Sequence, residues 1–471
     1  MTTTKRDILA AFNKTDLLEI ARRCELDVDD DATPEDLRAR IGPVVTVPKR
    51  VLFATLGKAE PRSAGRFFQL KGRGEVTKDD IVERMAPAEC ANLAKVLPTL
   101  SPDSLRDACG EIGLPMDGLT SAVFVERLLS AVMFSDEERE HLVNAFIDLT
   151  IPRIKERLKD KGVRATKKTK AGFRESLYGA LEQAQVTYRD IVGWLDEVDP
   201  WRAQQVLLLR ERPQGVGEWP DAAYVRAQLT GHEHEPCFNA TIPVVLPARM
   251  TISSIEHSME RMRVIAYVRR RNRAKVPELT RSEVLDDGRR IVWTASHEFV
   301  VRAAIIFEWD FVTNTAMLRI TQMSDGEKHE NVGDAFRDAV RGWLPVIDEF
   351  PSLDLQPSIR ALDRNEAAGG KDVRPYKMAY HSAGGRLAEG STGSHQPFHG
   401  ELSFDNAWEQ FREGGIGRHG NFHWLANGAD LSTDVHVFIN AHPNANRVRF
   451  YVDLDEATIH YVLARIRHYC A

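Results

Sequence analysis

Cysteine is scarce in this sequence, which argues against a disulfide-stabilised fold and against a thiolate metal centre. The chain holds five cysteines in 471 residues, and none of them forms a CxxC pair. Cys24 and Cys109 fall on the apolar faces of predicted helices, where a cysteine usually serves as a small core residue. We therefore expect reduced thiols and no disulfide framework.

Long apolar runs are also missing. No uninterrupted apolar stretch approaches the roughly twenty residues that a membrane-spanning helix needs. The start, MTTTKRDILAAFNKTDLLEI, has a charge pair and then the pattern of an amphipathic helix, without the apolar core of a signal peptide. These features predict a cytoplasmic protein without a membrane partner.

Motifs of common catalytic loops are absent as well. The sequence holds no GxSxG, no P-loop GxxxxGK[ST] and no GxGxxG that opens a helix. Histidines gather late in the chain, but Pro397 between His395 and His399 breaks the helical spacing that would direct both at one metal ion. We predict no catalytic residue, no bound metal and no cofactor.

Two pairs of acids keep a metal-dependent enzyme open as an alternative. Glu308 and Asp310 lie two residues apart in FEWDF, and Asp453 and Asp455 repeat that spacing in VDLDE. Residues two apart in a strand point to the same face, and paired carboxylates at strand ends can hold Mg²⁺. No lysine accompanies either pair in a matching motif, so we favour a protein that is not an enzyme.

A repeated helix-loop-helix pattern is the clearest feature that the sequence does contain. The segment Leu100–Leu129 predicts a helix, an extended loop and a second helix, and Asn13–Ile41 repeats it. Ser101-Pro102 and Thr33-Pro34 each supply an N-cap followed by a first-turn proline. The apolar positions of the first helices align as Leu17, Ile20, Ala21, Cys24 and Leu26 with Leu105, Ala108, Cys109, Ile112 and Leu114.

The second copy resembles the SAP-type helix-extended-loop-helix module through Gly113-Leu114, Gly118 and Leu128-Leu129. The resemblance implies binding of double-stranded DNA, which SAP-type modules contact through the loop and the start of the second helix. The first copy has Glu25-Leu26 in place of Gly-Leu, and its loop Asp27–Asp31 is acidic and would repel phosphate. Two similar helical hairpins within one all-helical domain remain the alternative.

Two basic segments are candidates for nucleic-acid contact. Between Pro152 and Arg174 the chain has ten Lys or Arg residues against two acids, on a helix whose predicted buried stripe includes Ile154 and Leu158. The exposed side of such a helix is either simply in contact with water or binds phosphate groups. The candidates in this segment are Lys155, Lys159, Lys161, Arg164, Lys167, Lys168 and Lys170.

The second basic cluster follows an apolar strand pattern and is the sharper anion-binding candidate. It consists of Arg269, Arg270, Arg271, Arg273 and Lys275. Cations this close repel one another unless a partner or nearby acids compensate them. Aromatic residues do not interleave with the cluster, which disfavours recognition of single strands at this place.

The secondary-structure pattern predicts a multidomain α+β protein. Helical patterns dominate as far as Glu211, and strand-like runs follow the Gly/Pro-rich RPQGVGEWPD; they include TIPVVLP, RVIAYVRR, RIVWTAS, VRAAIIFEWDF, AMLRITQM, VHVFINA and RVRFYVDL. Two strand-strand-helix units predict a sheet with helices on one face, and 362–400 is predicted to be a long loop. The predicted domains are a first SAP-like module at 1–45, a helical region with the second module at 46–150, a basic helical connector at 151–214 and an α+β domain at 215–471.

Taken with a net charge of −6, these features predict a non-catalytic protein that binds double-stranded DNA through local basic segments. A protein–protein adaptor is the first alternative, because the acidic loop Asp27–Asp31 suits a protein partner better than DNA. A metal-dependent enzyme in the C-terminal domain is the second.

Overall fold

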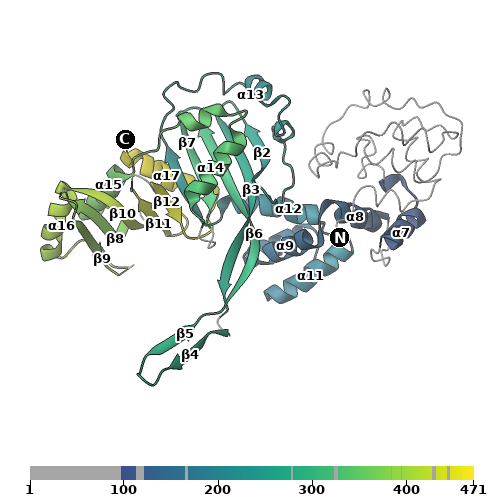
Figure 1. The fold of residues 1–471 in the computed structure, drawn as a ribbon, viewed down its shortest axis with the longest axis horizontal. Coiled ribbons are helices and arrows are strands. Elements are labelled where there is room, and N and C mark those ends of the chain that lie inside the picture. Colours follow the sequence, from purple (N-terminus) through teal and green to yellow (C-terminus); the bar gives the residue numbers. More distant parts are fainter. Residues whose placement is uncertain are drawn as a thin grey trace. The chain divides into compact units, whose positions relative to one another are not determined.

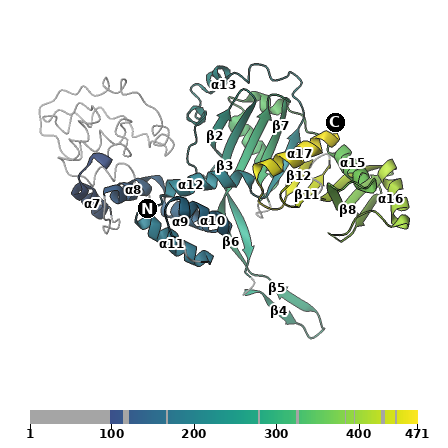
Figure 2. The ribbon, with the colours of Figure 1, turned by 180° about the vertical axis from the view of Figure 1, so that it is seen from behind.

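The chain divides into two compact units in the computed structural model, Met1–Leu195 and Asp196–Ala471. Each unit is described by itself (Figures 1 and 2). The first copy of the repeat and Lys167 lie outside the described part of the chain. The described residues are 97–112, 121–164, 168–276, 279–322, 327–382, 384–393, 395–426, 431–442 and 446–470.

The described part of the first unit is helical, as its sequence predicts. Ser101 and Ser135 cap two of the helices, and Ser135 forms a reciprocal capping box with Glu138. No helix in the described ranges is both long and apolar enough to cross a membrane. The helices are α7 Pro102–Glu111, α8 Ser121–Met133, α9 Asp136–Ile147, α10 Ile151–Asp160 and α11 Lys170–Glu182, and α12 Tyr188–Val198 runs across the division between the units.

The second copy of the repeat forms two helices, α7 and α8, as predicted. Leu105, Ala108, Cys109 and Leu128 are fully buried, so these positions of the repeat face inward; Gly113, Leu114 and Gly118 lie outside the described residues. The buried thiol of Cys109 has its pKa raised to about 11, chiefly by burial. Cys109 is thus a core residue, as its position on the apolar face predicts.

The second unit is built on one ten-stranded antiparallel sheet, with the order β2-β3-β6-β7-β1-β12-β11-β10-β8-β9. With the helices of the first unit, this sheet makes the chain an α+β protein. The strands are β1 Gln204–Leu209, β2 Thr251–His257, β3 Arg261–Lys275, β6 Ser296–Asp310, β7 Thr315–Thr321, β8 Val373–Ser382, β9 Leu387–Ser391, β10 Gly415–Trp424, β11 Val435–Asn440 and β12 Arg447–Phe450.

Helices cover both faces of this sheet, so the expectation of helices on one face is wrong. The helices are α13 Ala222–Leu229, α14 His329–Val340, α15 Gln356–Ala367, α16 Leu402–Gly414 and α17 Glu456–Cys470. Gly333 of α14 lies against Leu318 and Ile320 on one face of β7. Met317 points to the other face and shares a core with Ile459 of α17. Figure 1 accordingly shows α14 in front of the strands and Figure 2 shows α17 there.

Strand β1 corrects the prediction that helices continue to Glu211. It pairs with β7 on one side and with β12 on the other, and so joins the two halves of the sheet. Its sequence, QQVLLL, ends in a short apolar run whose spacing does not distinguish a helix from a strand. Pairing with β7 on one side and β12 on the other makes this segment a central strand rather than a helix.

Two further segments differ from their predictions. Residues 362–400 are not one long loop, because they contain the end of α15 and the strands β8 and β9. The strand predicted for TIPVVLP does not form, and Thr241 makes only an isolated bridge to Ser254. Pro243 and Pro247 cannot donate hydrogen bonds to a neighbouring strand, which explains the missing strand.

A two-stranded arm projects from the sheet (Figure 1). Strands β3 and β6 pair along their whole length, from Arg261 opposite Asp310 to Lys275 opposite Ser296. In the described ranges β2 follows β3 only to Tyr267, so the outer ends continue as a free ribbon. We name residues 269–302 the arm; its tip carries the small sheet of β4 Arg281–Val284 and β5 Arg290–Trp293.

Candidate nucleic-acid interface

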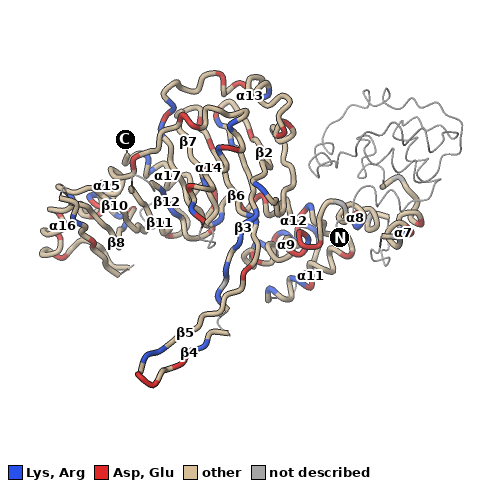
Figure 3. The backbone as a smooth tube through the Cα atoms, viewed as in Figure 1, with Lys and Arg blue, Asp and Glu red and all other residues tan. Residues whose placement is uncertain are grey.

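Four cations line one face of the arm. Side chains alternate between the two faces of a strand, so Arg269, Arg271, Arg273 and Lys275 point to the same side of β3, and all four are exposed. Figure 3 shows Lys and Arg following the arm. We name these four residues the basic row. The second predicted cluster therefore becomes a linear array of positive charge on a projecting ribbon.

An ion pair across the ribbon partly neutralises the basic row. The Arg273 guanidinium Nη2 lies 2.6 Å from Glu298 Oε1, and the two side chains are 61% and 48% exposed. An ion pair between exposed side chains contributes at most about 1 kcal/mol. A phosphate group can therefore replace Glu298 as the partner of Arg273 at little cost.

Arg270 differs from the basic row because it points to the opposite face of β3. Its side chain is only 2% exposed, and its Nη2 lies 3.3 Å from Glu327 Oε2. Burial and the charge of Arg270 lower the pKa of the neighbouring His329 to about 4. Although the sequence prediction grouped Arg270 with its neighbours, the folded chain holds it inside the base of the arm, away from an approaching phosphate.

The tip of the arm exposes apolar side chains. Both strands of the small sheet are exposed along their whole length, and a two-stranded sheet alone is marginally stable in water. The exposed apolar residues of the tip are Leu279, Val284, Ile291, Val292 and Trp293. This surface is suited to contact with another molecule.

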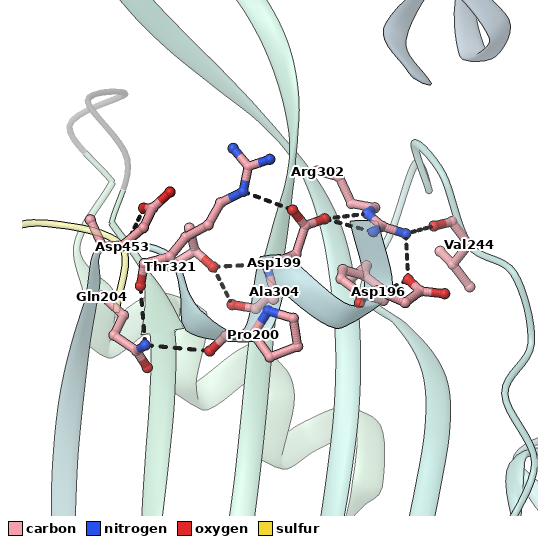
Figure 4. A network of polar contacts seen from close by, with 12 residues as sticks. Asp196, Asp199, Pro200, Gln204, Val244, Arg302, Ala304, Thr321 and Asp453 are labelled. Atoms are coloured by element: carbon pink, nitrogen blue, oxygen red, sulfur yellow. Dashed lines mark hydrogen bonds and ion pairs between the residues drawn. The ribbon is translucent and has the colours of Figure 1, made fainter. Parts of the chain in front are cut away.

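The base of the arm is held by a buried ionic network (Figure 4). Arg302 stands opposite Arg269 in the ribbon. Its guanidinium donates to Asp199 at 2.8 and 2.6 Å, to Asp196 at 2.8 Å and to the Val244 carbonyl at 2.7 Å. Tyr267 packs beneath it, with the guanidinium carbon 4.1 Å from the ring centroid.

The two carboxylates of this network favour the charged form of the Arg302 guanidinium. Burial lowers the pKa of Arg302. Tyr267 and the carboxylates of Asp199 and Asp196 raise it by more than burial lowers it, so the net pKa lies above its ordinary value. Burial raises the pKa of Asp196, and Arg302 opposes that rise. No local sequence pattern predicts this network, because Arg302 lies about a hundred residues from its two aspartates in the chain.

The basic segment of the first unit folds as its pattern predicts. Ile154 and Leu158 are fully buried in α10, and Gly162, with a φ of 72°, follows the end of the helix. Two of the candidate cations are tied to acids. Lys161 Nζ lies 2.6 Å from Asp190 Oδ1. Lys170 Nζ lies 3.7 Å from Asp148 Oδ1 and also donates to the backbone carbonyl of Asp148. The exposed candidates also include Lys155, Lys159, Arg164 and Lys168.

The acid pairs considered for metal binding have structural partners. Glu308 is buried and accepts a hydrogen bond from Arg263 Nε at 3.0 Å. Asp453 accepts from the Ala203 amide, and Asp455 caps α17 through Thr458. In the described ranges, no three His, Cys, Asp or Glu side chains are grouped so that they could hold a metal ion.

His399 is bonded to acids through both ring nitrogens. Its Nδ1 lies 2.9 Å from Asp405 Oδ1, and its Nε2 lies 2.6 Å from Asp363 Oδ1. Tyr380 and Trp408 also donate to Asp363, which is fully buried. Burial lowers the pKa of His399, but the neighbouring carboxylates raise it more, so the net pKa lies above its ordinary value. This cluster fixes the segment before α16 onto α15.

Comparison with known proteins identifies no family for this chain. The sequence matches no protein-family model and no curated protein. Function is therefore inferred from the surfaces of the chain itself, and the arm with its basic row is the surface with the clearest chemistry.

Proposed function

We propose that the protein binds nucleic acid, specifically double-stranded DNA, through the arm. The observation that carries this proposal is the basic row, with four cations on one face of a projecting two-stranded ribbon. A two-stranded β-ribbon fits the major groove of B-DNA, and Lys and Arg side chains neutralise the phosphates on either side. The arm holds nine Lys or Arg residues against five acids, although the whole chain is acidic.

The helical half of the chain supports the same proposal. The resemblance of Leu100–Leu129 to the SAP-type module suggests a second contact with duplex DNA, and the exposed cations of α10 suggest a third. In this proposal the N-terminal half is a helical region with tandem modules, the second of which adds affinity, and the protein acts in the cytoplasm as a binding protein. The arm is expected to provide the largest share of the phosphate contacts.

The experiment is a titration of labelled duplex DNA at several salt concentrations, followed by fluorescence anisotropy. The triple variant Arg271→Ala, Arg273→Ala, Lys275→Ala removes three candidate phosphate contacts and leaves the buried Arg270 in place. Each phosphate contact contributes about −0.9 to the slope of log K against log salt concentration, so the slope should flatten by about 2.7. The affinity should fall at least about tenfold.

The matched control removes three exposed cations of the same unit outside the arm: Arg249→Ala, Arg341→Ala and Lys371→Ala. It changes the net charge by the same amount and should leave the salt slope nearly unchanged. Equal effects of the two triple variants would show that the arm is not the site. No binding of duplex at low salt would overturn the proposal as a whole.

A protein partner is the second candidate function, and the apolar tip favours it. A cluster of exposed apolar side chains on a monomer commonly marks an interaction surface. If the protein is an adaptor, a partner purifies with it in fixed stoichiometry and is lost from the variant Val292→Ser, Trp293→Ser, while the triple variant of the basic row retains it. Loss of duplex binding from the basic-row variant alone would favour DNA.

A further inference from the structure

One half of the ten-stranded sheet carries rings on a face that helices do not bury. In β10, β11 and β12, fully buried residues such as Phe422, Val437 and Phe450 share a core with α15 and α17. The residues between them point to the other face and are only partly buried. Figure 2 shows α15 and α17 over the buried side, whereas in Figure 1 these strands face the reader.

Four rings meet on this partly exposed face, and each comes from a different segment. His423 of β10 stacks on His436 of β11 at 5.1 Å between centroids, and His436 stacks on Tyr451, just after β12, at 4.7 Å. Tyr376 of β8 lies 4.8 Å from His423 and 5.2 Å from His436. We name these four rings the ring platform. Tyr451 is its most exposed member, at 37%.

Hydrogen bonds hold the ring platform in place, and its two imidazoles carry no charge. The Tyr376 hydroxyl lies 2.7 Å from His436 Nε2, which also approaches Asn421 Oδ1 at 3.2 Å. Burial and the neighbouring His423 lower the pKa of His436 to about 4, and burial also lowers the pKa of His423. Both imidazoles are therefore neutral near pH 7. His436 is stacked between His423 and Tyr451, so Tyr451 is the ring at the end of the stack.

Cations border the platform. The Arg449 guanidinium carbon lies 5.7 Å from the centroid of Tyr451 and 5.9 Å from that of Phe438. Arg447 lies on the same face of β12, where its pair with Glu330 is 3.4 Å long. The charge of Arg374 also reaches His423. Positive charge beside uncharged rings complements a chain that combines phosphates with flat bases.

We propose that this face binds single-stranded nucleic acid, with a base stacked on Tyr451 and backbone phosphates at Arg449 and Arg447. Every base has a π-face, so stacking tolerates any sequence, and a sheet face with aromatic side chains is suited to unpaired bases. The site is separate from the basic row, which is suited to duplex. The proposal thus adds a second ligand class and does not depend on the arm.

The first measurement compares three labelled probes of equal length by fluorescence anisotropy. They are a 20-nucleotide oligothymidylate, a 20-base-pair duplex and a 20-nucleotide strand of abasic sites. Because an abasic strand keeps the phosphates and lacks the bases, it should bind at least about tenfold more weakly than oligothymidylate if the rings stack on bases. Equal binding of these two strands, or no binding of oligothymidylate at low salt, would overturn the proposal.

Substitutions test whether oligothymidylate binds at the ring platform. Tyr451→Ala should weaken oligothymidylate binding at least about tenfold, whereas Tyr451→Phe, which keeps the ring, should retain it. Phe411→Ala is the matched control, because Phe411 lies on α16 and is also 37% exposed. Equal losses from Tyr451→Ala and Phe411→Ala would count against the platform. Thermal unfolding of each variant verifies that it folds.

A photocrosslink on the unaltered protein keeps the test independent of variant stability. An oligothymidylate that carries 4-thiothymidine should crosslink to the peptides of β10, β11 and β12; crosslinks confined to the arm or to the first unit would overturn the proposal. The arm variant separates the two functions. Arg271→Ala, Arg273→Ala, Lys275→Ala should lose duplex and keep oligothymidylate, and Tyr451→Ala should do the reverse.

Discussion

The inner and outer ends of the β3–β6 ribbon place the same residue type in opposite roles. In the inner part, Arg263 and Arg302 are 7% and 5% exposed, and each bonds to two or more carboxylates. In the outer part, Arg271 and Arg273 are exposed to water. The inner arginines hold the layers of the sheet together, whereas the outer arginines lie at the surface, where Arg273 pairs with the exposed Glu298.

The difference shows that the surroundings of a strand, rather than its residue types, decide what an arginine does. Where neighbouring strands and a covering layer exclude water, a guanidinium must find carboxylates or lose much of its solvation energy. Where the ribbon leaves the sheet, water solvates the charge and no fixed partner is required. Four predictions test this contrast, from the largest expected effect to the smallest.

The largest effect is expected at the base of the arm. Arg302→Ala leaves Asp196 and Asp199 without their main cationic partner, and breaking a buried ion pair in this way costs about 3 to 5 kcal/mol of unfolding free energy. Arg271→Ala, on the outer part of the ribbon, should change it by less than about 0.5 kcal/mol. Urea denaturation of both variants measures the contrast; similar losses from the two would contradict it.

The second prediction concerns pH at the base of the arm. The pKa of His329 in the folded chain is about 4, below its ordinary value of 6.5, because of burial and the charges of Arg270, Arg447 and Arg449, which Glu330 partly offsets. The unfolded chain therefore binds the proton first as the pH falls. The contribution of His329 to stability is full above pH 6.5 and declines by about 2 to 3 kcal/mol toward pH 4.

His329→Gln should flatten this decline, which urea denaturation at pH 4.5 and pH 7 can measure. Arg270→Gln should raise the pKa of His329 in an NMR titration, because one of the charges that lowers it is gone. Arg271→Gln is the control on the outer face of the same strand. A pKa that moves equally in both variants would mean that Arg270 does not differ from the basic row.

A smaller effect separates the hydrogen bond of Tyr267 from its stacking. The Tyr267 hydroxyl donates to Asp196 at 3.1 Å, and the ring packs against Arg302. Tyr267→Phe removes only the hydroxyl, so the free energy of unfolding should fall by about 1 to 2 kcal/mol. A loss as large as that of Arg302→Ala would show that the hydroxyl, and not the ion pair, holds the base of the arm.

The smallest effect is expected at the tip. Replacing 276–295 with an Asn-Gly turn joins Lys275 to Ser296, which already face each other across the ribbon. Because both strands of the tip are exposed, the free energy of unfolding should change by less than about 0.5 kcal/mol. A loss above about 1 kcal/mol in urea denaturation would mean that the tip packs against the rest of the protein.

Much of the local structure could be predicted from the sequence. The caps at Ser101 and Ser135, the buried stripe of α10 and the order β11-β12-α17 all follow from patterns within a few residues. The alternation of β3 could also have separated Arg270 from Arg271, since adjacent strand residues point to opposite faces. The sequence prediction treated the cluster as one unit and missed that distinction.

Other features depend on contacts between distant segments. The ring platform brings together residues 376, 423, 436 and 451, which lie in four separate segments and share no local pattern. The strand β1 and the Arg302 network likewise depend on which strands become neighbours.

Caps, turns and hydrophobic periodicity act between residues that are close in the chain, so the sequence by itself determined most of the helices, the strand-strand-helix units and the positions of the two basic segments. The tertiary structure alone decided which face of each strand is covered, and with it which arginines are buried, which are exposed and which rings meet. The physical reason is that burial and strand pairing are long-range properties: a guanidinium or an imidazole acquires its solvation, its partners and its pKa only when segments far apart in the sequence pack around it.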